Sequence, residues 1–334
     1  MGVSVALVSY VLNGKEKEAR ISTEMSDKIR RTAIELNYQP NMIAKSLKSG
    51  KTNTIGLIVA DISNPFFSGI ARIVEDEAKK HNYVVIFGSS DENADNQQDL
   101  IDVFLNRLVD AFIIAPTAGT EKQILALKKR NVPVILIDRY FPGTDVDCVH
   151  INNFMAASKA VQKLISNGRS KIAMLAYDTK LTHMQQRKDG YKTVLKENGI
   201  RSKSSWLLEV PYHNMENEIS EKMDALLNRL QVDAFLFATN SLAVAGLKKI
   251  NEYGIRVPEE LAIISFDESD AFDFFYSPVT YVSQSITDIG KEAVKLSIAR
   301  MENKVKKTAE VTIEAKLIIR ESCGSKTKVK SKPA

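Results

Sequence analysis

The stretch Thr54–Ala60, with the sequence TIGLIVA, contains no charged residue and is apolar at nearly every position. A helical pattern follows over about Phe67–Asn82, and a second apolar run, YVVIF, occupies Tyr83–Phe87. Continuous apolar strands that alternate with amphipathic helices are typical of a parallel sheet that helices cover on both faces. This stretch therefore predicts that an α/β fold begins at residue 54.

The same alternation of short apolar runs and helical patterns continues along the chain. It next predicts, in order, helix Gln97–Arg107, strand Ala111–Ala115, helix Glu121–Arg130 and strand Pro133–Asp138. The pattern then starts again and predicts helix Phe154–Asn167, strand Lys171–Ala176, helix Gln186–Asn198, strand Ser205–Val210, helix Glu216–Arg229, strand Ala234–Ala238, helix Leu242–Tyr253 and strand Leu261–Phe266. Two successive sets predict two doubly wound parallel-sheet lobes, whose ligands bind at the carboxyl ends of the strands.

The charge of the chain is unevenly placed. The net charge is +5 over 334 residues, but residues 1–53 carry nine Lys and Arg against five Asp and Glu, a net of +4. Residues 321–334 form a basic tail with four Lys against one Glu, and the stretch from Lys326 has little apolar content to pack, so we expect that stretch to be disordered. A basic front segment on a nearly neutral body suits nucleic acid, although the same charges could form a solvated helix surface.

Several function classes find no support in the sequence. There is no G-x-G-x-x-G motif and no P-loop, so nucleotide chemistry is not indicated. Cys148 and Cys323 are far apart, and the four histidines, at positions 81, 150, 183 and 213, sit in no metal-ligand spacing; we expect reduced thiols, no metal and no cofactor. No apolar run is long enough for a membrane span, and no secretory signal is present. We therefore expect a cytoplasmic protein that is not an enzyme.

Residues 1–53 show a different, all-helical pattern. Ser4 can cap a short helix that ends at Asn13-Gly14, and Ser22 can cap a second helix. The second helix places Met25, Ile29, Ala33 and Leu36 on one stripe. Residues 41–49 form a short, weak helix candidate after the break at Pro40.

Three strings, in order and at characteristic spacing, resemble the lactose/galactose-repressor (LacI/GalR) family of transcription regulators. Residues 2–14 (GVSVALVSYVLNG) look like the turn and recognition helix of its DNA-binding headpiece. Residues 35–47 (ELNYQPNMIAKSL) look like the end of its third helix and its hinge helix, and residues 54–59 look like the first strand of its sensor domain. The resemblance extends over almost the whole chain.

The resemblance implies an α/β fold of two periplasmic-binding-protein-like lobes behind a small all-α helix-turn-helix headpiece. The family's headpiece starts with a further helix, so residues 1–39 correspond to a headpiece that lacks helix 1; a start site upstream and a degenerate headpiece are both open. The implied domains are a partial headpiece (1–39), a hinge helix and linker (40–53), a sensor domain (54–320) and the basic tail (321–334). Within the sensor domain, the N-lobe comprises about 54–153 and 285–316, and the C-lobe comprises about 154–284 and 317–320.

The resemblance also implies how the headpiece meets DNA. The recognition helix enters the major groove, where apolar side chains pack on thymine methyls and hydroxyls contact bases or phosphates. In the family, paired hinge helices enter the minor groove and a leucine, matched here by Leu47, wedges a base step open. The implied DNA-binding residues are Ser4, Val5, Ala6, Ser9 and Tyr10 in the headpiece and Asn41, Ala44, Lys45, Leu47 and Lys48 in the hinge.

A set of polar and aromatic residues at or near predicted strand ends matches the ribose-type sugar site of this fold. Amide, carboxylate and guanidinium groups can fix sugar hydroxyls, and aromatic rings can lie against a sugar face. The implied ligand-binding residues are Asn64, Phe66, Phe67, Asp138, Arg139, Arg187, Tyr212, Asn240, Asp267 and Gln284. Ser241 stands where the family usually carries Asp, which puts the hydrogen bonds around Asn240 in question.

These matches favour a homodimeric repressor that binds operator DNA and responds to a small effector, with a neutral monosaccharide preferred over a purine or a phosphorylated sugar. The main alternative is a cytosolic sugar-binding protein that has lost DNA binding. An enzyme on this fold is a weaker alternative, since no nucleophile with a matching histidine stands at a strand end.

Overall fold

The computed structural model describes residues 2–38, 51–228, 231–305 and 307–325. Contacts divide the chain into two compact units, Met1–Thr52 and Asn53–Ala334. The hinge residues singled out from the sequence, Asn41, Ala44, Lys45, Leu47 and Lys48, lie outside the described residues.

The first unit contains two helices, α1 (Val5–Leu12) and α2 (Thr23–Glu35). Each begins after a serine whose hydroxyl accepts a hydrogen bond from the backbone amide three residues later. Ser4 accepts from the Leu7 amide at 3.2 Å, and Ser22 accepts from the Met25 amide at 3.3 Å. Val11 and Ile29 are buried where the helices pack together. The two serine caps are thus as the sequence predicts.

The apolar stripe predicted on the second helix is shorter than expected. Leu36 is the C-cap of α2 rather than a helical residue, and its side chain is 73% exposed. The Leu36 amide still donates to the Thr32 carbonyl at 3.0 Å, as in a helix, so the stripe fails at this point because no described residue covers the Leu36 side chain.

The second unit consists of two lobes, each with a six-stranded sheet. The N-lobe strands are β1 (Thr54–Val59), β2 (Val84–Ser89), β3 (Ala111–Ile114), β4 (Val134–Ile137), β5 (Asp147–Ile151) and β11 (Glu310–Ile313). They pair in parallel in the order β11-β5-β4-β3-β1-β2. Adjacent residues of β1 enter the cores on opposite faces, Leu57 on one side and Ile58 on the other, so the central strands are apolar throughout.

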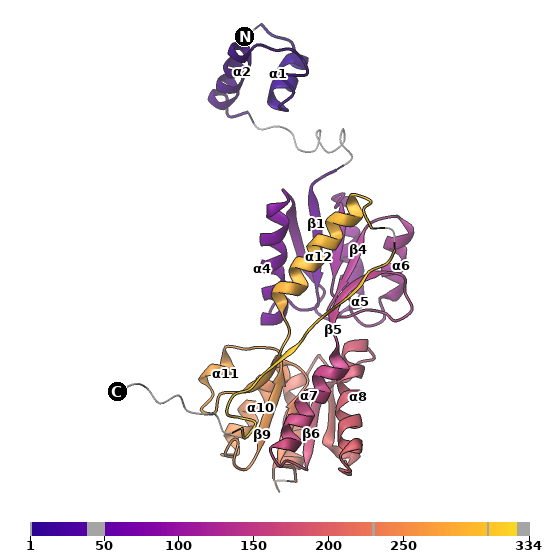
Figure 1. Ribbon diagram of the computed structural model, residues 1–334, viewed down its shortest axis with the longest axis vertical. Coiled ribbons are helices and arrows are strands. Elements are labelled where there is room, and N and C mark those ends of the chain that lie inside the picture. The colour runs from indigo at the N-terminus through magenta and orange to yellow at the C-terminus, as the bar shows by residue number, and fades with distance from the viewer. Residues whose placement is uncertain (1, 39–50, 229–230, 306, 326–334) are drawn as a thin grey trace, which may run out of the picture. The chain divides into compact units, whose positions relative to one another are not determined.

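Helices cover both faces of the N-lobe sheet. They are α4 (Pro65–Lys80), α5 (Ala94–Asn106), α6 (Glu121–Lys129) and, from far along the chain, α12 (Ile286–Met301). Figure 1 shows α12 beside α4, against which it packs. Asn64 caps α4 by accepting a hydrogen bond from the Phe66 amide at 3.0 Å, and Pro65 follows at the first helical position.

The C-lobe repeats this topology. Its strands are β6 (Ile172–Tyr177), β7 (Leu207–Val210), β8 (Ala234–Phe237), β9 (Ala262–Phe266), β10 (Thr280–Ser283) and β12 (Lys316–Ile318). They pair in the order β12-β10-β9-β8-β6-β7. Only β12 is antiparallel to its neighbour in this sheet. The helices are α7 (Asn153–Ser166), α8 (Thr182–Glu197), η1 (Ser204–Trp206), α9 (Met215–Leu227), α10 (Asn240–Glu252) and α11 (Ala271–Phe274). The expected pair of doubly wound parallel-sheet lobes is therefore confirmed.

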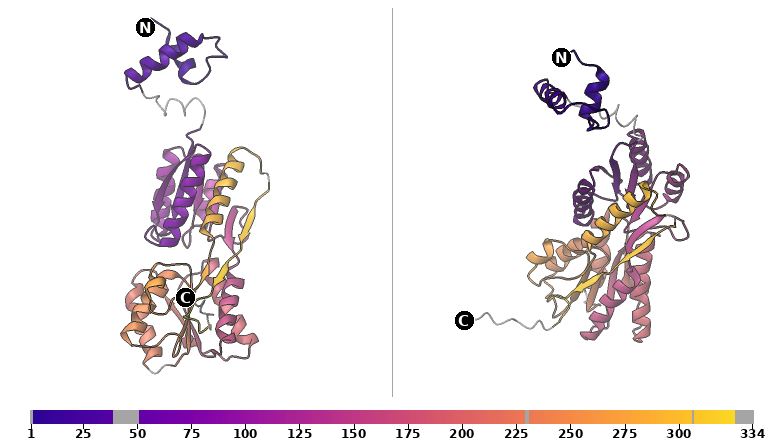
Figure 2. Two further views of the ribbon diagram at one scale, coloured as in Figure 1. Left: turned by 60° about the vertical axis from the view of Figure 1, so that its left-hand side comes forward. Right: turned by 45° about the horizontal axis from the view of Figure 1, so that its top comes forward.

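Three chain crossings join the lobes. They run from β5 into α7, from β10 into α12 and from β11 into β12. The views in Figure 2 show the last of these, the yellow C-terminal segment, passing from one lobe to the other.

The structure differs from the sequence-based expectations at further places. Elements α11, β10, α12, β11 and β12, all beyond residue 266, are not among those the sequence predicts. Strand β5 is not predicted either, because Asp147 and His150 interrupt its apolar run, although both side chains are buried. The expected strand Ser205–Val210 starts with the 3-10 turn η1, so only Leu207–Val210 is extended. The tail expected from residue 321 begins later, because Ser322 and Cys323 are fully buried.

Ser322 and its neighbours are in effect part of the C-lobe. The Ser322 carbonyl accepts a hydrogen bond from the Ile263 amide at 2.7 Å, and its hydroxyl accepts one from the Thr280 amide at 2.8 Å. Residues 321–325 therefore close the lobe, and residues 326–334 lie outside the described part of the chain. Among the described residues, no helix has the length and apolarity that a bilayer crossing requires.

Close packing of α7 on α8 gives a stability test. A Cβ at Gly190 would stand 2.5 Å from the Phe154 carbonyl oxygen, whereas a Cβ at Gly69 on α4 would meet only the flexible end of Ile286. We expect Gly190→Ala to lower the free energy of unfolding by about 2 kcal/mol, since backbone cannot yield to overpacking. Gly69→Ala, the matched control, should change it by less than about 1 kcal/mol. Urea unfolding followed by circular dichroism measures both, and equal effects would contradict the packing described.

Candidate functional site

A small cavity lies where the carboxyl ends of the two sheets face each other. Its free volume is about 30 Å³, which suits one or two water molecules. The lining residues are Asp61, Asn64, Phe66, Phe67, Glu92, Asp138, Arg139, Tyr177, His183, Arg187, Tyr212, Thr239, Asp267 and Gln284. Both lobes contribute, as expected for doubly wound sheets, which bind ligands beyond their carboxyl ends.

The structure brings together nine of the ten residues that the sequence singled out; Asn240 does not line the cavity. Asn240 is the first residue of α10, and its amide nitrogen donates to the Asn64 Oδ1 at 3.1 Å and to the Glu268 carbonyl at 3.3 Å. Its own oxygen accepts from the Ser241 amide at 2.7 Å. Asn240 is thus engaged by protein groups on all sides, and Ser241 joins this network in place of the family's usual Asp.

The guanidinium of Arg139 is enclosed by carboxylates. It donates two hydrogen bonds to Glu92, at 2.8 Å from Nη1 and 2.6 Å from Nη2, and Nε lies 3.3 Å from the Asp138 Oδ2. The ring of Phe67 packs against it, with the guanidinium carbon 5.5 Å from the ring centre. Burial alone would lower the pKa of Arg139, but Glu92 and Asp138 outweigh it and hold the pKa above its ordinary value. Arg139 is therefore a permanently charged, preoriented fork.

Arg187 supplies the second buried guanidinium, from α8 of the C-lobe. It donates from Nε to the Asn153 Oδ1 at 2.8 Å and from Nη1 to the Ala238 carbonyl at 2.6 Å. The Phe266 ring lies 4.1 Å from its guanidinium carbon. Burial lowers its pKa, and the nearby Asp267 and Asp138 carboxylates oppose that effect.

Two aspartates occupy equivalent places in the two lobes. Asp138 follows β4 and Asp267 follows β9, both with positive φ, +62° and +65°. Each backbone amide donates to the next strand at 2.9 Å, Asp138 to the Val149 carbonyl and Asp267 to the Val282 carbonyl. Non-glycine residues seldom adopt this left-handed conformation, so these bonds hold each carboxylate in place at the end of its strand.

Burial shifts the protonation of both aspartates. It raises the pKa of Asp138, although Arg139 and Arg187 partly oppose the shift. It raises the pKa of Asp267 to about 6, opposed by Arg187 and by the hydrogen bond from the Gln284 side chain at 2.6 Å. The cavity therefore holds one carboxyl group, that of Asp267, whose pKa lies close to neutral pH.

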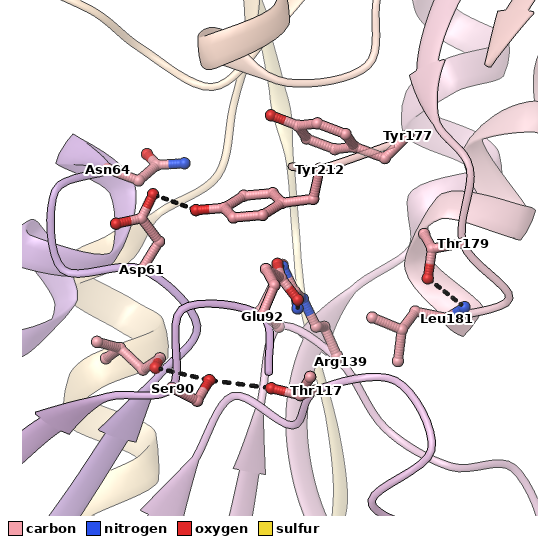
Figure 3. Close-up of polar contacts among 12 residues, drawn as sticks. Asp61, Asn64, Ser90, Glu92, Thr117, Arg139, Tyr177, Thr179, Leu181 and Tyr212 are labelled. Carbon is pink, nitrogen blue, oxygen red and sulfur yellow. Dashed lines mark hydrogen bonds and ion pairs between the residues drawn. The ribbon is translucent and has the colours of Figure 1, made fainter. Parts of the chain in front are cut away.

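Hydrogen bonds between the lobes close the cavity. The Tyr212 hydroxyl donates to the Asp61 Oδ2 at 2.5 Å (Figure 3), and Asn64 reaches Asn240 and Ser241. Partial burial acts to raise the pKa of Asp61, but hydrogen bonds from Ser63 and Tyr212 outweigh it and leave that pKa below its usual value. The charged form of Asp61 thus helps to hold the two lobes together.

Three buried polar atoms on the cavity wall have no hydrogen-bond partner among the described residues: Asp138 Oδ1, His183 Nδ1 and Gln284 Oε1. Burial, with Arg139, Arg187 and Lys188 nearby, holds the pKa of His183 well below its ordinary value, so this imidazole is neutral. Buried polar atoms normally have partners, and orphaned ones at a cavity point to a ligand that supplies them.

Five lining residues escaped the sequence analysis: Asp61, Glu92, Tyr177, His183 and Thr239. Asp61, Glu92 and Thr239 each lie just beyond a strand end, which is a signal that could have found them. Glu92 sits in the turn after β2 with φ +54°, and Figure 3 shows its carboxylate against Arg139. His183 faces the cavity from the first turn of α8, and its sequence neighbours give no hint of that.

In the first unit, the five headpiece residues singled out from the sequence form one exposed surface. Ser4, Val5, Ala6, Ser9 and Tyr10 are all exposed, and Val5 is 86% accessible. Ser4 is the N-cap of α1, and the other four residues lie within its first six positions, on the side of the helix away from Val11. This arrangement leaves the helix N-terminal end free for a partner.

Comparison with known proteins assigns both units. A model of bacterial regulatory proteins of the lacI family matches residues 1–41, and a model of the periplasmic binding protein-like domain matches residues 161–323. Catabolite control protein A of Priestia megaterium is 32% identical over 323 residues, which are 96% of this chain and 96% of that protein. The chain belongs to the lacI family of bacterial regulatory proteins. It is thus a DNA-binding transcription regulator.

Other relatives agree with this membership. The ribose operon repressor of Halalkalibacterium halodurans is 30% identical over 321 residues, 96% of this chain and 93% of that protein. The crystal structure of the transcription regulator CcpA of Lactococcus lactis matches with a TM-score of 0.74 and 26% identity, covering 80% of this chain and 98% of that one. These lacI-family relatives are named as regulators and repressors rather than enzymes.

The protonation of Asp267 gives a test of the site's electrostatics. Because the folded state binds this proton more tightly than the unfolded chain, the free energy of unfolding should fall as pH rises from about 4 to about 6. Asp267→Asn removes the cost of burying this charged carboxylate, because the asparagine side chain does not ionise. We expect the variant to be more stable than the native chain above pH 6, by up to about 3 kcal/mol for a shift of about two pH units, and equally stable at pH 4. Chemical denaturation at both pH values measures the difference. A variant less stable at pH 7 would contradict the burial effect.

Proposed function

We propose that this lacI-family protein is a repressor whose affinity for operator DNA is controlled by a neutral monosaccharide bound between the N-lobe and the C-lobe. The observation that carries the proposal is the cavity wall, where two fixed guanidinium groups stand beside three buried polar atoms without a partner among the described residues. The alternative of a sugar-binding protein without DNA binding is an outcome of the tests below.

The chemistry of the wall suits a polyol. Each sugar hydroxyl both donates and accepts a hydrogen bond, so it can accept from Arg139 or Arg187 and donate to Asp138 or Gln284. The rings of Phe66 and Phe67, packed edge to face at 5.1 Å, and the Tyr212 ring offer apolar surface for the C–H face of a sugar. Hydrogen bonds to charged partners are the stronger kind and give such a site its selectivity.

The charge of the wall argues against an anionic effector. Four carboxylates line the cavity, those of Asp61, Glu92, Asp138 and Asp267, against the guanidinium groups of Arg139 and Arg187. Two of the Arg139 N–H groups already donate to the Glu92 carboxylate, so they are not free to bind an anion. A phosphorylated sugar would bring further negative charge into this buried site, which is unfavourable without a free cation.

Sugar binding requires rearrangement. A free volume of about 30 Å³ is far below the several hundred Å³ typical of ligand pockets. We infer that an entering sugar parts the bonds between Tyr212 and Asp61 and between Glu92 and Arg139, and replaces them with its own hydroxyls. The lobes then settle at a different relative angle, since these bonds span or border the cleft.

A homodimer would transmit that change to DNA. Strand β2 lies at the edge of the N-lobe sheet and exposes Val84 (65%) and Phe87 (61%), with Val103 of the adjoining helix α5 also exposed. Exposed apolar side chains grouped at a sheet edge suit an interface with a second copy. Two copies would present two α1 helices to a two-fold symmetric operator. The coupling cannot exceed the sugar's difference in affinity for the two lobe arrangements.

The effector class is testable on the full chain. Neutral pentoses and hexoses at millimolar concentration should include at least one that raises the thermal unfolding midpoint, because binding to the folded state stabilises it. Their phosphate esters should not. Asp267→Asn should abolish the shift in the unfolding midpoint without loss of fold. Asp273→Asn, at an exposed side chain of α11, should leave that shift unchanged. A shift by sugar phosphates alone, or an undiminished shift in Asp267→Asn, would place the effector elsewhere.

The DNA-binding face is testable separately. An operator selected by the full chain from a random duplex pool should bind with a steep salt dependence, as phosphate contacts require. Loss of the Tyr10 hydroxyl in Tyr10→Phe should weaken binding about fivefold, near the 1 kcal/mol of a hydrogen bond. Tyr253→Phe, whose hydroxyl bonds Asp224 and Asn228 in the C-lobe, is the matched control. Failure to enrich any duplex would support the sugar-binding alternative.

A further inference from the structure

We infer that Cys148, His150 and Glu310 form a binding site for one divalent transition-metal ion of the zinc class, separate from the sugar cavity. One potential ligand atom from each residue lies within 4.8 Å of the other two. No other group of three or more Cys, His, Asp or Glu residues among the described ones could hold a metal ion in this way.

The strand register assembles these residues. Cys148 and His150 are two apart on β5 and therefore project from the same face of the sheet. Glu310 pairs with Cys148 across the parallel β5–β11 ladder. The thiol and the imidazole are 4% and 5% exposed, while the Glu310 carboxylate is largely exposed and opens the site to solvent.

The imidazole of His150 is held in the orientation that a metal ligand needs. Its Nδ1 lies 2.9 Å from the Ile151 carbonyl oxygen, which can only accept, so Nδ1 carries the hydrogen. The Tyr140 ring stacks on it at 4.4 Å between centres. A backbone carbonyl on one nitrogen commonly orients a histidine whose other nitrogen binds a metal.

That other nitrogen faces an acceptor. His150 Nε2 lies 3.0 Å from the Glu310 Oε1, and a neutral imidazole with its hydrogen on Nδ1 would turn a lone pair toward the carboxylate. A metal ion bound to both atoms would bring the nitrogen lone pair and the carboxylate oxygen to one cation. The buried Cys148 thiol lies on the same strand as His150 and offers the third ligand atom.

The ligand set fits a small divalent ion. Thiolate, imidazole and carboxylate are the usual zinc ligands, at about 2.0–2.3 Å, which places ligand atoms roughly 3.2–3.8 Å apart in a tetrahedron. The His150–Glu310 separation is near that range, and the thiol sulfur lies within 4.8 Å of both other ligand atoms. Water would complete the fourth position. Binding releases the thiol proton to solvent, because the thiolate is the form that binds a metal.

The location suggests what the ion would do. Strands β5 and β11 both run directly into crossings to the C-lobe. Tyr140, stacked on His150, also contacts the C-lobe: the Gln186 amide donates to its hydroxyl at 3.2 Å, and the Thr182 hydroxyl donates to its carbonyl at 2.9 Å. A metal would clamp two of the three crossing segments at their N-lobe ends and steady the lobe arrangement.

The test uses the reduced full chain titrated with Co(II) and with Zn(II). We expect one equivalent of Co(II) to produce a thiolate-to-cobalt charge-transfer band in the near ultraviolet, which Zn(II) then displaces. Cys148→Ser should remove the band, and Glu310→Gln, at an exposed side chain, should weaken binding at least about tenfold. Cys323→Ser, at the other buried thiol, is the matched control and should keep the band.

Two results would overturn the inference. One is the absence of a charge-transfer band at millimolar Co(II), which would leave His150 and Glu310 as a hydrogen-bonded pair without a metal. The other is a band that persists in Cys148→Ser, which would place the metal elsewhere. Sugar affinity and DNA binding do not enter the measurement, so its failure leaves the proposed function untouched.

Discussion

The sensor unit is organised around the need to keep two buried guanidinium groups paired. Arg139 and Arg187 lie out of contact with bulk water, where an unpaired charge costs far more free energy than a single hydrogen bond returns. The carboxylates of Glu92 and Asp138 pair with the Arg139 guanidinium. The Arg187 guanidinium donates hydrogen bonds to Asn153 and to a backbone carbonyl and packs against the Phe266 ring. The strand ends, the turn that holds Glu92 and the first turn of α7 supply these partners.

The two lobes solve this problem with the same device. In each, a central strand ends in an aspartate with left-handed backbone, held by an amide bond to the next strand. Because equivalent strands of the two sheets point their carboxyl ends at one another, the two carboxylates and two guanidinium groups converge in one cavity. Burial raises the pKa of both acids, which the guanidinium groups only partly oppose, and some polar atoms are left without partners. That unfavourable balance in the free protein is what a ligand rich in hydroxyl groups would relieve.

The same geometry connects the cavity to the rest of the molecule. Asp138 and Arg139 directly precede Tyr140, which bonds to α8 of the C-lobe and stacks on His150 of β5. These contacts link the cavity wall to the β5–β11 edge, where the chain crosses between the lobes. A small displacement of these strands could switch their contacts, because packed strands and paired charges adopt a few distinct arrangements and do not deform continuously.

The sequence by itself determined the fold class and most of the cavity wall. Continuous apolar runs such as TIGLIVA cannot be solvated on either face, and strand ends must then carry the polar residues that meet a ligand, as at Asp138 and Asp267. Tertiary structure alone decided that Glu92 takes the fork of Arg139, that Asn240 turns away to bond Asn64, and that Glu310 lies beside His150, 160 residues away. Periodicity reports which side chains are buried along one element, whereas these pairings depend on which elements the folded chain places side by side.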